Sequence, residues 1–299
     1  ELPHSDKFVV ADGAVVFTDK LGRDVSISQK PQRVIILDYN ALDLWYHAGG
    51  TAVGRTGHIL VDSRADEDEM GSEIKNVPIM NEAHDPVNIE MIVAQEPDLI
   101  IISPTNKTHL EAVESFEQYN IPYFAWDYDD FDGFIENLEL FTLLNDRGDL
   151  YEKYASDNII RVNAVREKIS GQEPVTMVML LPHATNGIYA LANSGYLGNL
   201  CEDMNLENIA GVETSTVVSI ESLLDIDPEW IFSRGGSGDG SEANAKAIFE
   251  SYPLWSELTA VKEGRFQHLP AELFLYHANT RYADAYEYLA NLVYPQIFN

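Results

Sequence analysis

The sequence contains a single cysteine, Cys201, and no apolar run long enough to cross a lipid bilayer. One cysteine can neither close a disulfide within the chain nor build a cysteine-rich metal site, so we expect Cys201 to be a small core residue. The longest apolar runs, such as VTMVMLL at 175–181, are far shorter than the ~20 residues of a transmembrane helix. We therefore predict that no part of this sequence spans a membrane.

Basic residues are also scarce. The 19 Lys and Arg residues stand against 49 Asp and Glu residues, which gives a net charge of −30. Nucleic acid and anionic membrane surfaces would repel such a chain, so neither is an expected partner. Solubility or adaptation to salt explains the charge without a partner, whereas a cationic docking partner would make use of it. Composition favours neither explanation.

The sequence lacks the motifs of several enzyme classes, because it has no G-x-S-x-G elbow, no P-loop and no H-E-x-x-H zinc motif. The segment GGSGDGSE at 235–242 does not match a phosphate-binding loop. The acidic segments DYDDFDG at 127–133 and DSRADEDE at 62–69 do not match a calcium loop. We therefore expect a binding protein with no catalytic residues and no intrinsic metal or cofactor. A nucleotide-dependent α/β enzyme and a surface adhesin or sensor are the alternatives.

Predicted strands and helices alternate along the chain. Strands are expected at 33–38, 51–56, 99–103 and 122–127, with helices at 40–48, 88–95, 107–119 and 132–145. The pattern restarts after residue 171, with strands at 175–182, 229–233 and 265–270 and helices at 194–204, 219–226, 242–250 and 280–292. Such alternation predicts two α/β lobes, each a mostly parallel sheet flanked by helices.

A long helix is predicted between the two lobes. Residues 149–170 contain no Gly or Pro, and apolar residues recur every three or four positions at Ala155, Ile159, Val162, Val165 and Ile169. This spacing predicts one helix with a single buried stripe, about 33 Å long. We expect it to join the lobes as a rigid backbone. The predicted division is an N-terminal lobe at 1–148, the interlobe helix at 149–170 and a C-terminal lobe at 171–299.

One segment occurs twice. NIEMIVAQEPDLIIIS at 88–103 is matched by SIESLLDIDPEWIFSR at 219–234, 131 residues later. Each copy opens with a residue that favours the helix N-cap and contains a proline that ends the helix before a buried strand. Glu90 and Glu221 occupy the same position in the first turn of the two predicted helices. The offset of one small domain again indicates two similar lobes.

The order of several segments resembles a known family, the substrate-binding proteins of ABC importers for iron–siderophore complexes, haem and cobalamin, which have a helical backbone between lobes. The resemblance covers nearly the whole chain. Besides the repeated segment and the long helix, it rests on FTDKLGRDVSISQKPQRVIILD at 17–38, GNLCEDMNLENIAG at 198–211 and LVYPQIF at 292–298.

This resemblance implies a location outside the cytoplasmic membrane, either as a lipid-anchored lipoprotein or free in a periplasm. It implies that the protein holds a small molecule between its lobes and delivers it to a permease dimer. In the resembled family a glutamate of each lobe docks onto arginines of the two permease subunits, which gives that role to Glu90 and Glu221. We expect the chain to work as a monomer.

Candidate ligand-binding residues follow from the fold class, because ligands of open α/β sheets bind beyond the carboxyl ends of the strands. The aromatic candidates have an alternative role as plugs of the strand ends, and the arginines Arg55 and Arg234 have one in internal salt bridges. The candidates are Tyr39, Arg55, His58, Asn106, Trp126 and Tyr128 in the first lobe and His183, Tyr189, Arg234, Tyr276, His277 and Arg281 in the second.

The identity of the ligand is left open by these residues. Aromatic, His and Arg side chains suit flat or anionic molecules through stacking and charge-assisted hydrogen bonds. We favour an iron(III) complex, with a ferric siderophore as the first choice. Haem is the second choice, because Tyr and His can serve as axial iron ligands. Within the resembled family, cobalamin and an oxyanion stay as alternatives.

Overall fold

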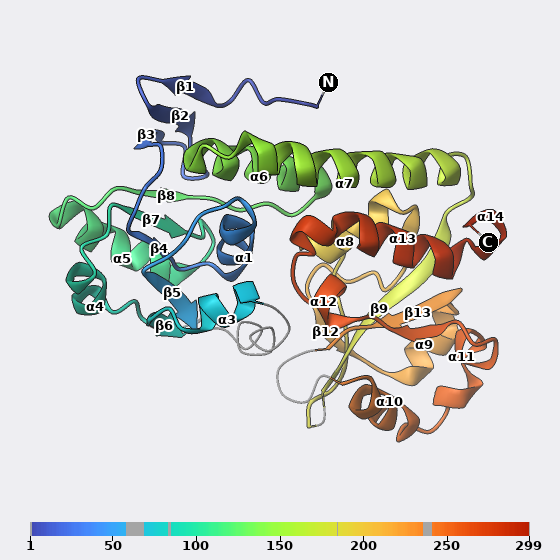
Figure 1. Cartoon of the computed structure of the whole chain (residues 1–299). Helices are drawn as coiled ribbons and strands as arrows, with labels where there is room; N and C mark the ends of the chain where they lie inside the picture. The colour runs from blue at the N-terminus through green and yellow to red at the C-terminus, as the bar shows by residue number, and fades with distance from the viewer. Residues whose placement is uncertain (1, 58–68, 83–84, 184, 236–240, 299) are drawn as a thin grey trace. The chain divides into compact units, whose positions relative to one another are not determined.

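The structure is a computed structural model that describes residues 2–57, 69–82, 85–183, 185–235 and 241–298. The chain divides into two units of packed elements. Unit 1 comprises residues up to Tyr128 and Asp132–Asp157, and unit 2 comprises Asp129–Phe131 and the residues from Asn158 onward. Both units mix helices and strands, as the sequence predicts (Figure 1).

Unit 1 is built around a five-stranded sheet in the order β6-β5-β4-β7-β8, in which all neighbours are parallel. Its strands are β4 (Val34–Ile36), β5 (Gly54–Gly57), β6 (Ile79–Glu82), β7 (Leu99–Ile102) and β8 (Tyr123–Ala125). The helices are α1 (Tyr39–His47), α3 (Glu69–Lys75), α4 (Ile89–Ala94), α5 (Lys107–Gln118) and α6 (Phe131–Asn145). Ile35, Ile100 and Phe116 belong to its buried core. A fully buried β7 is what the run LIII predicts for a central strand covered on both faces.

An N-terminal antiparallel sheet of β1 (Val9–Ala11), β2 (Ala14–Thr18) and β3 (Asp24–Ser28) was not expected from the sequence. Its β2–β3 turn covers one edge of the parallel sheet. Lys20 N–H donates to the carbonyl of Ala125 in edge strand β8 (3.0 Å), and the Asp19 carboxylate accepts from Ala125 N–H (3.1 Å). Arg23 pairs with the same carboxylate. The turn thus binds backbone groups that an open edge would offer to another chain.

Unit 2 contains a six-stranded mixed sheet in the order β12-β10-β9-β13-β14, with β11 also paired to β9. Its strands are β9 (Val175–His183), β10 (Gly187–Ala190), β11 (Leu206–Asn208), β12 (Thr216–Val218), β13 (Trp230–Ser233) and β14 (Phe266–His268). Strands β11, β9, β13 and β14 pair in parallel, whereas β10 is antiparallel to both of its neighbours. The sequence pattern predicts the parallel strands of this sheet but not the antiparallel strands β10 and β12 at its edge.

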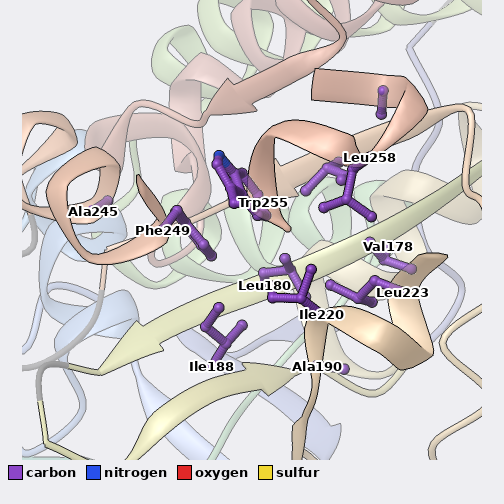
Figure 2. Close-up of a cluster of buried hydrophobic side chains, with 12 residues drawn as sticks. Val178, Leu180, Ile188, Ala190, Ile220, Leu223, Ala245, Phe249, Trp255 and Leu258 are labelled. Carbon is purple, nitrogen blue, oxygen red and sulfur yellow. The ribbon is translucent and has the colours of Figure 1, made fainter. Parts of the chain in front are cut away.

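The helices of unit 2 pack against its sheet and form an apolar core with it. Figure 2 shows Val178 and Leu180 of β9 packed with residues of α9 and α10, including Ile220 and Phe249. The Phe249 and Trp255 rings stack with centroids 4.6 Å apart. Cys201 is buried, as expected, and burial raises the pKa of its thiol to about 12. The helices are α8 (Gly195–Asp203), α9 (Ile220–Ile226), α10 (Glu242–Glu250), α11 (Thr259–Lys262), α12 (Ala271–Phe274), α13 (Tyr282–Val293) and α14 (Pro295–Phe298), with short 3-10 turns at Trp255–Glu257 and Asn279–Arg281.

Helix α7 (Gly148–Ile169) is continuous across the boundary between the two units, which confirms the long connecting helix (Figure 1). In its first part, the Tyr151 hydroxyl donates to the carbonyl of Pro3. In its second part, Arg166 binds the Asp203 carboxylate of α8 (2.8 Å from Nε). None of the helices in the described ranges combines the length and the apolar character that a membrane crossing requires.

The two copies of the repeated segment begin and end their helices alike. The Asn88 side chain accepts from Met91 N–H (3.0 Å) at the start of α4, and Ser219 accepts from Ser222 N–H (3.1 Å) at the start of α9. Both predicted N-caps are therefore confirmed.

The residue before each proline takes the left-handed conformation, at φ 47° for Glu96 and 43° for Asp227. The helix cannot continue through such a residue. The chain therefore leaves each helix by the same sharp turn and enters the buried strand that follows.

Candidate functional site

A half-buried carboxyl group, that of Asp38, follows β4 in unit 1. Asp38 caps α1, because its Oδ1 accepts from Ala41 N–H at 2.9 Å. Burial raises the pKa of Asp38, although the backbone N–H groups of Ala41 and Asn40 oppose the shift. Tyr39, the predicted candidate, begins α1 and is only 9% exposed. Asp38 was missed as a candidate, and its signal was a residue that favours the N-cap at the last position of the strand predicted at 33–38.

Arg55 lies inside unit 1. Its side chain is buried in β5, and the guanidinium donates to the carbonyls of Thr56 (2.9 Å) and Lys75 (3.2 Å). These bonds hold Arg55 within its own unit, so a contact with ligand stays a prediction. The neighbouring candidate His58 lies outside the described residues.

Two polar side chains follow β7, the predicted candidate Asn106 and His109, which sequence reasoning missed. Asn106 caps α5 by accepting from Thr108 N–H (3.0 Å). In the first turn of α5, His109 is buried and its Nδ1 accepts from Ser103 N–H (3.2 Å). Within the described residues its Nε2 has no hydrogen-bond partner. Burial lowers the pKa of His109 to about 4, so the ring is neutral with its proton on Nε2.

The two aromatic candidates after β8 are both buried. Trp126 is packed against Phe8 and Phe17, with ring centroids 5.9 Å away in each case. The Tyr128 ring lies 6.3 Å from that of Phe134. Both rings therefore belong to the packing of unit 1, which is the strand-plugging alternative, and a ligand contact for either stays a prediction.

Arg234 follows β13 in unit 2 and is half-buried. Its Nη1 donates to the carbonyl of Leu275 (3.0 Å). Among the residues that the structure describes, Arg234 forms no ion pair and its buried Nε has no acceptor. Burial lowers the pKa of Arg234, and the nearby Tyr276 opposes that shift; burial raises the pKa of Tyr276, and Arg234 opposes it. The structure therefore brings a cation and a phenol together at this strand end.

His277 lies beside this pair in sequence and is buried. Its ring centroid is 5.2 Å from that of Tyr196, and its Nε2 is 3.9 Å from an Asp129 carboxylate oxygen. Burial lowers the pKa of His277 to about 4, so the imidazole is neutral near pH 7.

His183 and Tyr189 belong to the β9–β10 hairpin. The Nδ1 atom of His183 accepts from the backbone N–H groups of Thr185 (3.3 Å) and Asn186 (3.2 Å). The side-chain amide nitrogen of Asn186 lies 3.5 Å from the other ring nitrogen, Nε2. Tyr189 lies in β10, where it pairs with Leu181 of β9 on one side and Val217 of β12 on the other.

Arg281 lies in the 3-10 turn before α13, and its side chain is 47% exposed. Its Nε donates to Asp284 Oδ2 at 3.0 Å. No cluster of three or more His, Cys, Asp or Glu side chains is placed to hold a metal ion in the described part of the chain. The unit 2 candidates therefore offer hydrogen-bond donors and positive charge to a ligand.

The sequence model of the periplasmic binding protein family matches residues 34–273. The chain belongs to this family. A vitamin B12-binding protein from Vibrio campbellii is 25% identical over 229 residues, which cover 75% of this chain and 79% of the relative. The Fe(3+)-citrate-binding protein YfmC from Bacillus subtilis is 24% identical over 262 residues, which cover 84% and 76%.

A solved structure of the same fold is the TroA-like periplasmic binding protein FepB from Veillonella parvula. It is 21% identical, its TM-score is 0.75, and the match covers 95% of this chain and 91% of that one. The match to the family model confirms the resemblance seen in the sequence. The chain is a substrate-binding protein of an ABC importer and not an enzyme, it works outside the cytoplasm, and its partner is a membrane permease.

Proposed function

We propose that this periplasmic binding protein captures an anionic iron(III) complex, with a ferric siderophore as the favoured cargo, and delivers it to its permease. The observation that carries the proposal is Arg234. This half-buried cation follows strand β13 and, within the described residues, has no carboxylate partner in a chain that holds 49 acidic residues.

Partial burial of an unpaired guanidinium costs free energy, because water that would solvate the charge is removed. An anionic ligand at this strand end offsets that cost by supplying the missing acceptors. Tyr276 stands beside Arg234 and adds a hydroxyl group and an aromatic face. The relative that binds Fe(3+)-citrate supports a ferric cargo, since its name specifies an iron complex with an anionic chelator.

Cobalamin is the second candidate, because one relative is a vitamin B12-binding protein. Haem is the third candidate, because Tyr276 lies next to Arg234 and a tyrosine can serve as an axial iron ligand.

Glu90 and Glu221 are the proposed contacts with the two permease subunits. Both are exposed in the first turn of matching helices, α4 and α9. A carboxylate in this position also stabilises the helix end without any partner. The matched pair, one in each unit, favours a docking role on a permease dimer.

The test is a titration of the purified protein with ferric citrate, a ferric hydroxamate, a ferric catecholate, haemin and cyanocobalamin, followed by intrinsic fluorescence. We expect saturable binding of at least one anionic ferric complex. Arg234→Ala should weaken that binding by about tenfold or more. Arg265→Ala is the control. Arg265 precedes β14, which is parallel to β13, so it lies at the other end of these strands from Arg234, and it pairs with Glu263. Binding of cyanocobalamin alone would replace the iron proposal by the cobalamin one.

A further inference from the structure

One carboxylate at the start of α13 binds two guanidinium groups. Asp284 accepts from Arg281 Nε at 3.0 Å through Oδ2 and from Arg161 Nη2 at 2.7 Å through Oδ1. Arg161 lies on α7, and all three residues belong to unit 2. Arg281 is one of the candidate ligand contacts, so Asp284 connects a candidate contact to the connecting helix.

The two arginines depend on Asp284 to different degrees. Arg161 also binds Glu287, at 2.9 Å from Nε and 2.6 Å from Nη2. Arg281 pairs with no carboxylate other than Asp284 in the described ranges. Loss of the Asp284 charge therefore leaves Arg161 with a partner and releases Arg281.

Asp284 remains ionised at neutral pH. Its partial burial opposes ionisation, but the hydrogen bonds from Arg161 and Arg281 outweigh burial and lower the pKa of the carboxyl group. An anionic ligand that approaches Arg281 must therefore compete with a charged group only three residues away in the sequence.

The backbone around Arg281 is held by a different side chain. Asn158 is buried in α7, and its amide donates to the carbonyl of Thr280 (2.9 Å) and accepts from Ala283 N–H (2.8 Å). These two bonds span Arg281 on both sides. A substitution of Asp284 should therefore change the freedom of the Arg281 side chain while the backbone stays in place.

We propose that Asp284 is a positioning residue that restrains Arg281 and thereby limits the affinity of unit 2 for an anionic cargo. The inference rests on the proposed function, because it takes Arg281 as a ligand contact. Anion and carboxylate compete for the same guanidinium donors, and a weaker competitor leaves more of the guanidinium for the cargo.

The first test needs no ligand. Phenylglyoxal modifies accessible arginines, and mass spectrometry of the peptide that contains Arg281 gives the rate. Asp284→Asn should raise this rate severalfold, whereas Glu287→Gln should leave it unchanged. The two variants remove the same charge from the same helix, but Glu287 contacts Arg161 and not Arg281. Equal Arg281 rates in the wild type and Asp284→Asn overturn the proposal.

The second test is titration with ferric citrate at two salt concentrations. Asp284→Asn should bind ferric citrate roughly two- to fivefold more tightly than the wild type, and Glu287→Gln should match the wild type. The gain should shrink at high salt. An unchanged or weaker affinity of Asp284→Asn contradicts the proposal. If the wild type binds no ferric complex, the proposed function fails, and the modification rates still decide whether Asp284 restrains Arg281.

Discussion

Asp98 and Glu229 stand 131 residues apart in the two copies of the repeated segment, and each binds the start of a neighbouring strand. The Asp98 carboxylate accepts from the N–H groups of Gln32 (2.7 Å) and Arg33 (2.9 Å), just before β4. Glu229 accepts from the N–H of Thr176 in β9 (2.9 Å). Since β7 pairs with β4 and β13 pairs with β9, the repeat fixes the register of two central strands.

Removal of either carboxylate should therefore destabilise its own unit. Asp98→Ala and Glu229→Ala should each lower the free energy of unfolding by about 0.5–1.5 kcal/mol, because backbone donors lose a charged acceptor at an exposed site. Urea unfolding followed by circular dichroism measures the change. Glu202→Ala is the control, as this residue is an exposed glutamate of α8. Variants as stable as the wild type would show that water replaces these acceptors at no cost.

A second prediction concerns Asp19 in the turn that covers β8. Burial disfavours its charged form, but hydrogen bonds from Arg23 and from Ala125 N–H outweigh burial and lower the pKa of Asp19. A carboxyl group with a depressed pKa in the folded state stabilises the fold above its unfolded pKa, near 4. This contribution is lost as the pH falls through the lower folded value.

Asp19→Asn should consequently be less stable than the wild type at pH 7, and the difference should shrink below about pH 4. Urea midpoints at pH 7, 5 and 3 give the comparison. Asp12→Asn serves as the control, because Asp12 is exposed in the β1–β2 turn. A gap between Asp19→Asn and the wild type that is constant over this range would argue against a titrating buried pair.

The repeated segment and the long helix were predictable because their signals are local. Asn88 and Ser219 satisfy backbone donors within their own helix, and the apolar stripe of α7 is read from spacing alone. The edge strand β12 has no such signal. Its residues are largely exposed, and only pairing with β10 makes them a strand. The β2–β3 turn depends on a contact with Ala125, about a hundred residues away, which no local pattern encodes.

The candidate site was only partly predictable for the same reason. Strand ends can be located from the sequence, and they led to Arg234 and Tyr276. The partners of each side chain depend on tertiary packing, which places Arg55 inside its own unit and leaves Arg234 without a carboxylate among the described residues. His109 was missed because it lies in a helix, where its spacing is that of an ordinary core residue.

A third prediction concerns His109. Burial lowers its pKa to about 4 in the folded state, against about 6.5 for an exposed histidine. The unfolded chain therefore binds a proton in this interval that the folded chain excludes, so stability falls as the pH drops from about 6.5 to 4. The contribution of His109 to this loss reaches about 3 kcal/mol at most.

His109→Gln removes the titration while its amide oxygen can still accept from Ser103 N–H. The variant should lose less stability than the wild type between pH 7 and pH 4.5, measured as the shift of the urea midpoint. Parallel pH profiles for the wild type and His109→Gln would mean that the ring is protonated in the folded protein.

The last prediction concerns Glu90 and Glu221. Each lies in the first turn of its helix, where a carboxylate interacts favourably with the positive helix end, and this interaction alone explains one acidic residue. The helix-end interaction does not explain why both copies of the repeat expose a glutamate at the same position, one in each unit. The proposed docking role accounts for the pair, because a permease dimer would present the same cationic contact twice. Glu90→Arg and Glu221→Arg should therefore leave ligand affinity nearly unchanged, lower stability by about 0.3–1 kcal/mol, and abolish uptake.

Uptake of the labelled cargo by cells that carry the permease measures the effect of these variants, beside ligand titration of the purified proteins. Glu202→Arg makes the same charge change at an exposed position of α8 in unit 2 and should leave uptake intact, which separates docking from a general loss of negative charge. The like charges at the docking surface should act through association, so a higher concentration of the binding protein should restore part of the uptake in the single variants. Full uptake by the double variant Glu90→Arg/Glu221→Arg would reduce both residues to ordinary helix-end charges.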